Sequence, residues 1–201
     1  MKLLELYAGT GSVGKVAKTL GYDVISLDRD MEADIKTNIM DWDYKTFPTG
    51  HFDVIWSSPP CTEYSIAKTV GIRDIEGSNK VVQRTLDIIS YFQPKYWIME
   101  NPQTGYLKNQ PFMLDLPFKD VDYCSYGMPY RKRTRLWNNI FDWTPRPLCK
   151  KDCWAMDDDK KRHKMIAQRG ATKTYTTSNF KQSELYRVPE ELIKEIFSNI
   201  N

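Results

Sequence analysis

A glycine-rich turn between two short apolar stretches places the strongest constraint on how this chain folds. The spacing G-x-G-x-x-G, from Gly9 to Gly14, follows a strand-like stretch at 3–7 and precedes a helical stretch at 15–20. This context is the one that the motif requires, because the strand delivers the turn and the helix begins directly after it. The pattern predicts a strand–turn–helix unit at the start of a larger fold.

Asp28 gives the glycine turn a ligand-binding interpretation. It lies 19 positions after Gly9, at the end of the next strand-like stretch, 23–27. Glycines let the backbone approach a ligand closely, and a carboxylate at this place can bind both hydroxyls of a ribose. We therefore predict a nucleotide-like cofactor, for which a nicotinamide dinucleotide and S-adenosylmethionine fit equally well. A tight turn with glycines kept for packing is the alternative.

Strands and helices alternate along the first two thirds of the chain. Further strand-like stretches near 35–40, 52–56 and 96–99 surround a helical stretch over about 80–92. Such alternation predicts an α/β fold, with a mostly parallel twisted sheet and helices on both faces. After about Trp143 the alternation fades. A last amphipathic helix begins at Pro189, with four apolar residues at helical spacing: Leu192, Ile193, Ile196 and Phe197.

Two strand-like stretches end in loops that carry reactive side chains. Pro59-Pro60-Cys61 follows the stretch at 52–56, and Glu100-Asn101-Pro102 follows the one at 96–99. Open α/β sheets bind their ligands at the carboxyl ends of their strands, so a thiol and a carboxylate are expected at one site. The prolines and the polar residues after Cys61 argue against a core position for this cysteine.

Composition restricts the class of protein. No apolar run is long enough to span a membrane, and four scattered cysteines do not form a disulfide framework, so we expect an intracellular, reduced protein. Residues 131–170 hold 12 Lys and Arg against 5 Asp and Glu, whereas the whole chain carries a net charge of only +3. This local excess of positive charge indicates a polyanionic partner, with a solvated loop as the alternative.

Five motifs, in this order, resemble those of the C5-cytosine methyltransferases over roughly residues 3 to 140. They are Leu4-Glu5-Leu6-Tyr7-Ala8-Gly9-Thr10-Gly11, Asp28, Pro60-Cys61, Glu100-Asn101-Pro102, and Tyr126-Gly127-Met128-Pro129 followed by Arg131, Arg133 and Arg135. Tyr186-Arg187-Val188-Pro189 and its helix resemble a degenerate form of the family's last motif. The resemblance implies the Rossmann-like fold of methyltransferases that use S-adenosylmethionine.

What the resemblance implies is the transfer of a methyl group to C5 of a cytosine flipped out of double-stranded DNA. Cys61 would attack C6 of the base, Glu100 would hold the ring at N3 and N4, and Arg133 and Arg135 would contact the nucleotide or its phosphate. A solvated basic turn is the alternative for the arginines. S-adenosylmethionine would bind through a set of nine residues, with Asp28 on the ribose and Asp41 on the adenine amino group: Tyr7, Ala8, Gly9, Thr10, Gly11, Ser12, Asp28, Asp41 and Pro60.

The chain departs from the family in two places. Tyr130 stands where the family has a glutamine and the arginines are displaced by one position, so the base-contacting role stays open among Arg131, Arg133 and Arg135. The target-recognition region is nearly absent. We expect a catalytic core at 1–141, a reduced recognition element at 142–185, and a helix at 186–201 that packs back on the core. Target specificity would then be short, relaxed or supplied by a partner protein, and we expect a monomer.

Cys149, Cys153 and His163 give the reduced segment a feature of its own, beside the basic run at 160–162. We expect no metal here but ordinary packing or a phosphate-contacting loop. Three zinc ligands, with Cys124 as a conceivable fourth, are the alternative.

Three other functions remain as alternatives to the DNA enzyme. RNA methylation needs the same chemistry, and a silent nucleic-acid-binding homologue would explain the lost recognition region. A nicotinamide-dependent oxidoreductase would explain the glycines and Asp28, but it leaves the Cys61 and Glu100 loops without a role.

Overall fold

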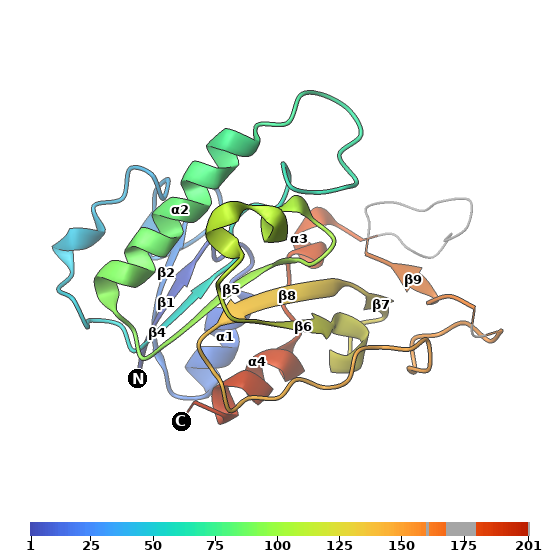
Figure 1. Cartoon of the computed structure of the whole chain (residues 1–201). Coiled ribbons are helices and arrows are strands. Elements are labelled where there is room, and N and C mark those ends of the chain that lie inside the picture. Colours follow the sequence, from blue (N-terminus) through green and yellow to red (C-terminus); the bar gives the residue numbers. More distant parts are fainter. Residues whose placement is uncertain (160, 168–179, 201) are drawn as a thin grey trace.

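The computed structural model describes residues 1–159, 161–167 and 180–200, and a seven-stranded sheet runs through it (Figure 1). The strand order is β3-β2-β1-β4-β5-β8-β6, in which the neighbours from β3 to β5 are parallel and β8 is antiparallel to both β5 and β6. The mostly parallel α/β sheet predicted from the alternation is therefore confirmed. The strands of the sheet are β1 Lys2–Leu6, β2 Asp23–Asp28, β3 Ile35–Lys36, β4 Val54–Ser57, β5 Tyr96–Pro102, β6 Phe118–Asp122 and β8 Arg133–Asn138.

Successive residues of the central strands enter two separate hydrophobic layers. Leu3 and Val54 belong to a cluster with α1 Ser12–Thr19 and α4 Glu190–Ser198, whereas Leu4 and Ile55 belong to a cluster with α2 Ile75–Phe92. Side chains alternate between the faces of a strand, so a sheet covered on both sides needs continuous apolar runs. In Figure 1, α2 lies over one face of the sheet and α1 with α4 over the other.

Two predicted helices take their expected places with adjusted ends. The helix α2 spans Ile75–Phe92 and begins five residues earlier than predicted, because the Asp74 side chain accepts a hydrogen bond from the Gly77 N–H at 2.8 Å. In α4 the four apolar residues expected to face the core are fully buried: Leu192, Ile193, Ile196 and Phe197. The short α3 spans Gln182–Leu185.

The part of the chain after β5 was not predicted as strands. The 3₁₀ turn Tyr123–Tyr126 joins β6 to the short β7, Tyr130–Arg131, which leads into β8 and pairs with β9, Met165–Ile166. Three further 3₁₀ turns are Tyr44–Thr46, Tyr106–Asn109 and Pro111–Met113. Within the described ranges, no helix has the length and apolar character needed to cross a membrane.

Candidate active site

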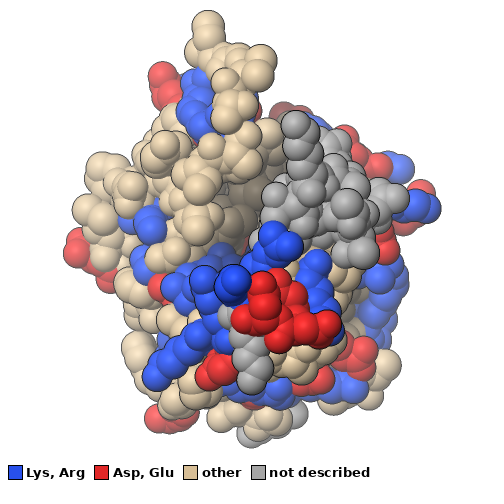
Figure 2. Space-filling view, turned by 90° about the vertical axis from the view of Figure 1, so that its right-hand side faces the viewer, with Lys and Arg blue, Asp and Glu red and all other residues tan. Residues whose placement is uncertain are grey.

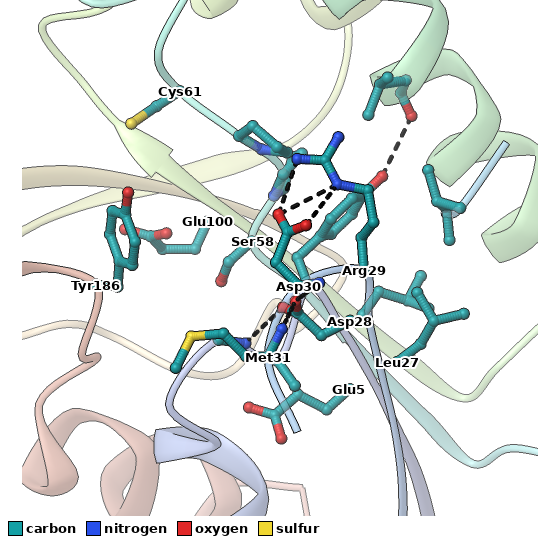
Figure 3. A pocket seen from close by; sticks show the side chains of 18 of the residues that line it. Glu5, Leu27, Asp28, Arg29, Asp30, Met31, Ser58, Cys61, Glu100 and Tyr186 are labelled. Carbon is teal, nitrogen blue, oxygen red and sulfur yellow. Dashed lines mark hydrogen bonds and ion pairs between the residues drawn. The ribbon is translucent and has the colours of Figure 1, made fainter. Parts of the chain in front are cut away.

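One cavity of about 440 Å³ opens at the carboxyl ends of β1, β2, β4 and β5. Its walls come from loops that follow these strands, together with part of the segment before α4. Figure 3 shows Cys61 and Glu100 on one side of the cavity and Asp28, Asp30 and Met31 on another. The cavity thus joins the glycine turn to the two strand-end loops, as the positions of the motifs predicted.

Asp28 is fixed in place by backbone amides of its own loop and of the glycine turn. Its Oδ2 accepts a hydrogen bond from the Gly9 N–H at 2.8 Å, and its Oδ1 accepts bonds from the N–H groups of Asp30 and Met31 at 2.8 and 2.9 Å. An ionised carboxylate has about four acceptor positions, so one remains for a ligand. Asp28 therefore presents a rigid acceptor to the cavity.

The glycine turn adopts a backbone that favours glycine. Gly9 has a φ of 55° and Gly11, which precedes α1, a φ of 66°. Gly14 is needed for another reason, because a Cβ there would lie 2.4 Å from Glu5 Oε2, which accepts the Gly14 N–H at 3.0 Å. The spacing of the three glycines thus serves both the turn and the packing of α1 on β1.

Glu5 is a buried carboxyl group in the wall of the cavity. It lies on β1 and is 3% exposed. Burial raises its pKa from 4.5 to about 7, although the bond from Gly14 and the charges of Lys18 and Lys15 act in the opposite direction. Glu5 was part of the motif quoted from the sequence but was not predicted as a site residue.

The loop that carries Cys61 is tied to the carboxyl end of β5. Asn101 Nδ2 donates to the Pro59 carbonyl at 2.8 Å, while Asn101 Oδ1 is buried and has no hydrogen-bond partner within the described part of the chain. Cys61 itself is half-buried and lines the cavity. Burial raises the pKa of its thiol, the charge of Lys132 lowers it, and Glu100 raises it further.

Glu100 is held by two groups from the edge of the sheet. The Tyr123 hydroxyl donates to Glu100 Oε1 at 3.0 Å, and Lys132 Nζ lies 3.6 Å from the same oxygen. Burial and the neighbouring Glu100 raise the pKa of Tyr123 well above its usual value, so its hydroxyl stays a donor at neutral pH. Glu100 is only 7% exposed, and its direction is fixed by these contacts.

Arg133 and Arg135, which the sequence predicts to contact the nucleotide or its phosphate, do not line the cavity. They form cross-strand ion pairs on β8, Arg133 with Asp122 at 2.8 Å and Arg135 with Asp120 at 2.8 Å. Arg131 also contacts Asp122, at 3.2 Å. Among residues 131–135, the basic side chain that lines the cavity is Lys132, which lies on the link between β7 and β8.

Most of the residues predicted to bind a cofactor line the cavity, and some do not. The lining includes six of them: Tyr7, Ala8, Gly9, Ser12, Asp28 and Pro60. Thr10 and Gly11 lie outside it, as does the exposed Asp41. The four residues that precede Asp41 line the cavity instead of Asp41: Thr37, Asn38, Ile39 and Met40. These follow β3 and bear no motif, so the sequence offered no signal beyond their proximity to Asp41.

Lys132, Tyr123 and Tyr186 were not predicted as site residues. Lys132 and Tyr186 line the cavity, and Tyr123 reaches it through Glu100. Lys132 stands between the arginines of a quoted motif, and Tyr186 begins the degenerate last motif, so both could have been identified from the sequence. Tyr123 could not be identified in this way, because its place next to Glu100 depends on β6, a strand that the sequence analysis did not predict.

The cysteines and histidine singled out in the reduced segment come together away from the cavity. Cys149, Cys153 and His163 are joined by Cys124, and the ligand atoms of all four lie within 4.8 Å of one another.

Comparisons with known proteins point to one family. A family model described as C-5 cytosine-specific DNA methylase matches residues 26–110. A protein of Frog virus 3 (isolate Goorha) named "Probable DNA (cytosine-5)-methyltransferase" is 33% identical to this chain over 217 residues, covering 98% of each.

A solved structure resembles the fold. A protein of E. coli assigned as a DNA modification methyltransferase, encoded within a prophage, superimposes with a TM-score of 0.54 and 16% identity. The match covers 74% of this chain and 52% of the other, so this chain corresponds to about half of that protein.

Proposed function

This chain belongs to the C-5 cytosine-specific DNA methylase family, and from this premise we propose that it methylates C5 of cytosine in DNA with S-adenosylmethionine as methyl donor. One observation carries the proposal. The Cys61 thiol and the Glu100 carboxylate line the same cavity as Asp28 and the glycine turn. A nucleophile and a nucleotide-binding carboxylate are thus connected by one continuous space.

The residues at the Asp28 end suit S-adenosylmethionine. The cavity volume falls within the range usual for small-molecule sites, about 300–1,000 Å³. Asp28 would accept from a ribose hydroxyl, the turn at Gly9 would hold the methionine part, and Ile39 with Leu27 would contact the adenine. When bound, the cofactor supplies a methyl group on a sulfonium, which is a strong electrophile.

Cys61 would act as the nucleophile. Its sulfur would bond to C6 of the cytosine, which shifts the ring electrons so that C5 becomes nucleophilic and can take the methyl group. Loss of the C5 proton to a base and elimination of Cys61 would then restore the C5–C6 double bond. Burial raises the pKa of the thiol and the charge of Lys132 lowers it, so Lys132 would favour loss of the thiol proton to solvent before the sulfur attacks C6.

Glu100 would hold the ring during this sequence. Its contacts with Tyr123 and Lys132 fix one carboxylate oxygen and leave Oε2 to accept a hydrogen bond from the N4 amino group of the cytosine. The buried Asn101 Oδ1, which lines the same wall, is a further acceptor for an amino group.

A base in a duplex cannot reach Cys61 inside this cavity, so the proposal requires that the cytosine leaves the helix. Lys and Arg side chains gather on the surface below the hollow in Figure 2, where they would meet phosphates. We propose that residues 142–185 take the place of a larger target-recognition region and that the protein acts as a monomer, with a partner protein as a possible source of specificity.

Nucleoside mass spectrometry of cells that produce the wild type tests the proposal, with Cys61→Ser and a wild-type-like Glu76→Gln as controls. We expect 5-methyldeoxycytidine with the wild type and Glu76→Gln and none with Cys61→Ser. Methylated cytidine confined to RNA would keep the chemistry and change the substrate. Absence of both, with folded protein that binds S-adenosylmethionine, would favour a silent nucleic-acid-binding homologue and contradict the proposal.

A further inference from the structure

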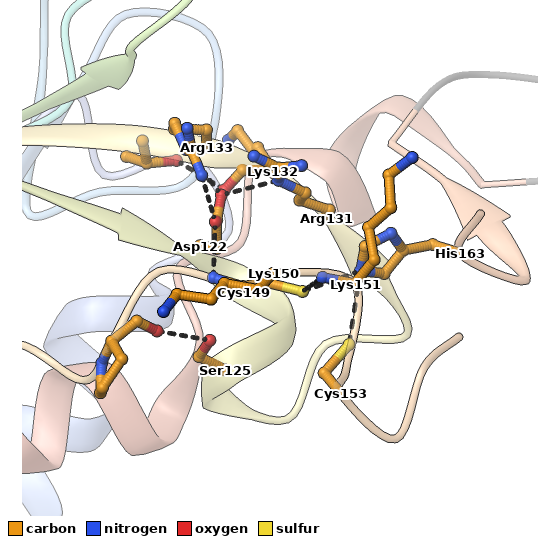
Figure 4. Close-up of polar contacts among 12 residues, drawn as sticks. Asp122, Ser125, Arg131, Lys132, Arg133, Cys149, Lys150, Lys151, Cys153 and His163 are labelled. Atoms are coloured by element: carbon orange, nitrogen blue, oxygen red, sulfur yellow. Dashed lines mark hydrogen bonds and ion pairs between the residues drawn. The ribbon is translucent and has the colours of Figure 1, made fainter. Parts of the chain in front are cut away.

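Three cysteine thiols and one histidine ring lie close together beside the edge of the sheet, outside the active-site cavity. Cys124 comes from the 3₁₀ turn after β6. Cys149, Cys153 and His163, which Figure 4 labels, come from the segment between β8 and β9. His163 Nε2 lies 3.5 Å from Cys149 Sγ and 3.3 Å from Cys153 Sγ. All four ligand atoms lie within 4.8 Å of one another.

We propose that Cys124, Cys149, Cys153 and His163 bind one zinc ion in a tetrahedral site. With Zn–S bonds of about 2.3 Å and a Zn–N bond of about 2.0 Å, a tetrahedron places sulfur and nitrogen about 3.5 Å apart and two sulfurs about 3.8 Å apart. The two sulfur–nitrogen separations match this to within a few tenths of an ångström. Three thiolates and one imidazole form a closed set typical of structural zinc.

The surroundings orient the ligands. The Lys151 N–H donates to Cys149 Sγ at 3.3 Å, and the Cys149 N–H donates to the buried Asp122 Oδ2 at 3.0 Å. The carbonyl of Cys124 accepts from Trp154 Nε1 at 3.2 Å. Hydrogen bonds of this kind hold ligands in place around a metal and stabilise thiolate charge.

The segment that supplies three of the ligands has little apolar material to hold it. Its buried cluster consists of small residues, Cys124, Cys149 and Ala155 with Cys153 beside them. The large Trp154 is 64% exposed and adds little to this cluster. A segment that cannot form a core of its own is the setting in which metal binding supplies folding energy.

A zinc ion would also secure the edge of the active site. An antiparallel bridge joins Met156 to His163, and two residues further on β9 pairs with β7, which leads directly into Lys132. The metal would therefore hold the segment that flanks the cavity residue next to Glu100. This site does not depend on methyl transfer, so it stands or fails separately from the proposed function.

Metal analysis of the full chain, purified under reducing conditions without added chelator, tests the proposal. We expect about one zinc per chain in the wild type and in Cys61→Ser, whose cysteine lies outside the cluster, and loss of that zinc in Cys149→Ser. Replacement by Co²⁺ should give the intense visible bands of a tetrahedral site and a thiolate charge-transfer band.

Loss of folding in a variant does not obscure the result, because zinc release can be followed in the wild type. Titration with an organomercurial should release zinc, detected with a chromogenic chelator, in step with modification of three thiols besides Cys61. A folded, reduced wild type that neither contains zinc nor takes up Zn²⁺ or Co²⁺ would overturn the proposal. So would a disulfide between two of the three cysteines, detected by mass under non-reducing conditions.

Discussion

The Lys132 ammonium lies 3.6 Å from the Glu100 carboxylate, on the link between β7 and β8. Its Nζ also donates to the Leu185 carbonyl at 3.2 Å and lies 5.0 Å from the centre of the Tyr123 ring. One cation therefore connects Glu100, the sheet edge and the segment before α4. Its positive charge also acts on the Cys61 thiol.

Replacing Lys132 by Met should make Cys61 less reactive at neutral pH. The charge of Lys132 lowers the pKa of the Cys61 thiol, so its removal reduces the thiolate fraction. We expect alkylation of Cys61 by iodoacetamide at pH 7, followed by peptide mass mapping, to slow several-fold and to recover at higher pH. Lys132→Arg, which keeps the charge, should stay near the wild-type rate. Equal rates in Lys132→Met and the wild type at every pH would contradict this role.

Glu100→Gln should lower the rate of methyl transfer by about 100-fold or more, the size expected when a group that stabilises developing charge is neutralised. Binding of S-adenosylmethionine, measured by calorimetry, should be unchanged, because Glu100 lies at the Cys61 side of the cavity. The control is Glu76→Gln, whose side chain is 83% exposed on α2. A parallel loss of cofactor affinity in Glu100→Gln would show that the variant disturbs the whole cavity.

Asp28→Asn should weaken S-adenosylmethionine binding by about 10- to 100-fold, since a hydrogen bond to a charged group contributes about 1.5–3 kcal/mol. Asp41→Asn should leave the affinity within about twofold, because Asp41 lies outside the lining of the cavity. Calorimetric titration of both variants separates the two carboxylates. A larger effect at Asp41 than at Asp28 would restore the adenine contact predicted from the sequence.

Glu5 should make the ligand-free protein less stable as the pH rises from about 4.5 to 7. Burial raises the pKa of Glu5 to about 7, whereas the unfolded chain loses this proton near pH 4.5. Below pH 4.5 the buried neutral acid costs the folded state no ionisation, and between pH 4.5 and 7 the free energy of unfolding falls because only the unfolded chain can release the proton. Denaturant unfolding should show Glu5→Gln gaining up to about 3 kcal/mol on the wild type across this range. A constant difference between the two proteins at all pH values would show that Glu5 is not buried as a neutral acid.

Asp122→Asn should destabilise the fold at neutral pH by about 2–3 kcal/mol, allowing for the partial exposure of its arginine partners. Burial alone would raise the pKa of Asp122, but hydrogen bonds and charges of Arg133 and Arg131 lower it. The stability that this carboxylate contributes is therefore present above its unfolded pKa and is lost as the pH falls through its folded pKa.

Asp120→Asn is the matched comparison, because Asp120 makes the equivalent pair with Arg135 two residues earlier on β6 but is 19% exposed. Unfolding of both variants at pH 7 and in acid should show the larger loss at Asp122 and a smaller gap between Asp122→Asn and wild type in acid. Equal losses would mean that burial does not distinguish the two pairs.

The parallel part of the fold was predictable because each strand is a continuous apolar run buried on both faces. Leu3 and Leu4 enter different layers, as do Val54 and Ile55, so every position in such a run is constrained. The strand predicted near 35–40 is shorter than expected and spans only Ile35–Lys36.

The antiparallel edge was not predictable from its own residues. Arg131, Arg133 and Arg135 alternate along the chain, and this spacing fits a basic surface turn as well as a strand. What decides between them is β6, whose Asp120 and Asp122 lie opposite two of the arginines. That pairing joins residues 11 to 15 positions apart, so local pattern alone cannot reveal it.

The active site shows the same division. Cys61, Glu100 and Asp28 were predicted because each follows directly from a strand end. Lys132 and Tyr123 reach Glu100 from the edge that the sequence did not resolve, and Thr37 to Met40 enter the wall through a loop without a motif. Strand ends are local features, whereas contacts between loops depend on the order of strands in the sheet.

The Val188 N–H donates to Ser12 Oγ at 3.2 Å across 176 positions of sequence, and Tyr22 stacks on Phe197 with ring centres 4.9 Å apart. Tyr186 and Val188 also close one wall of the cavity. During synthesis on the ribosome, the glycine turn is made well before the segment at 186–198 and has no finished wall until that segment has emerged. Nascent chains that stop before this segment therefore have an incomplete cavity and an uncovered sheet face.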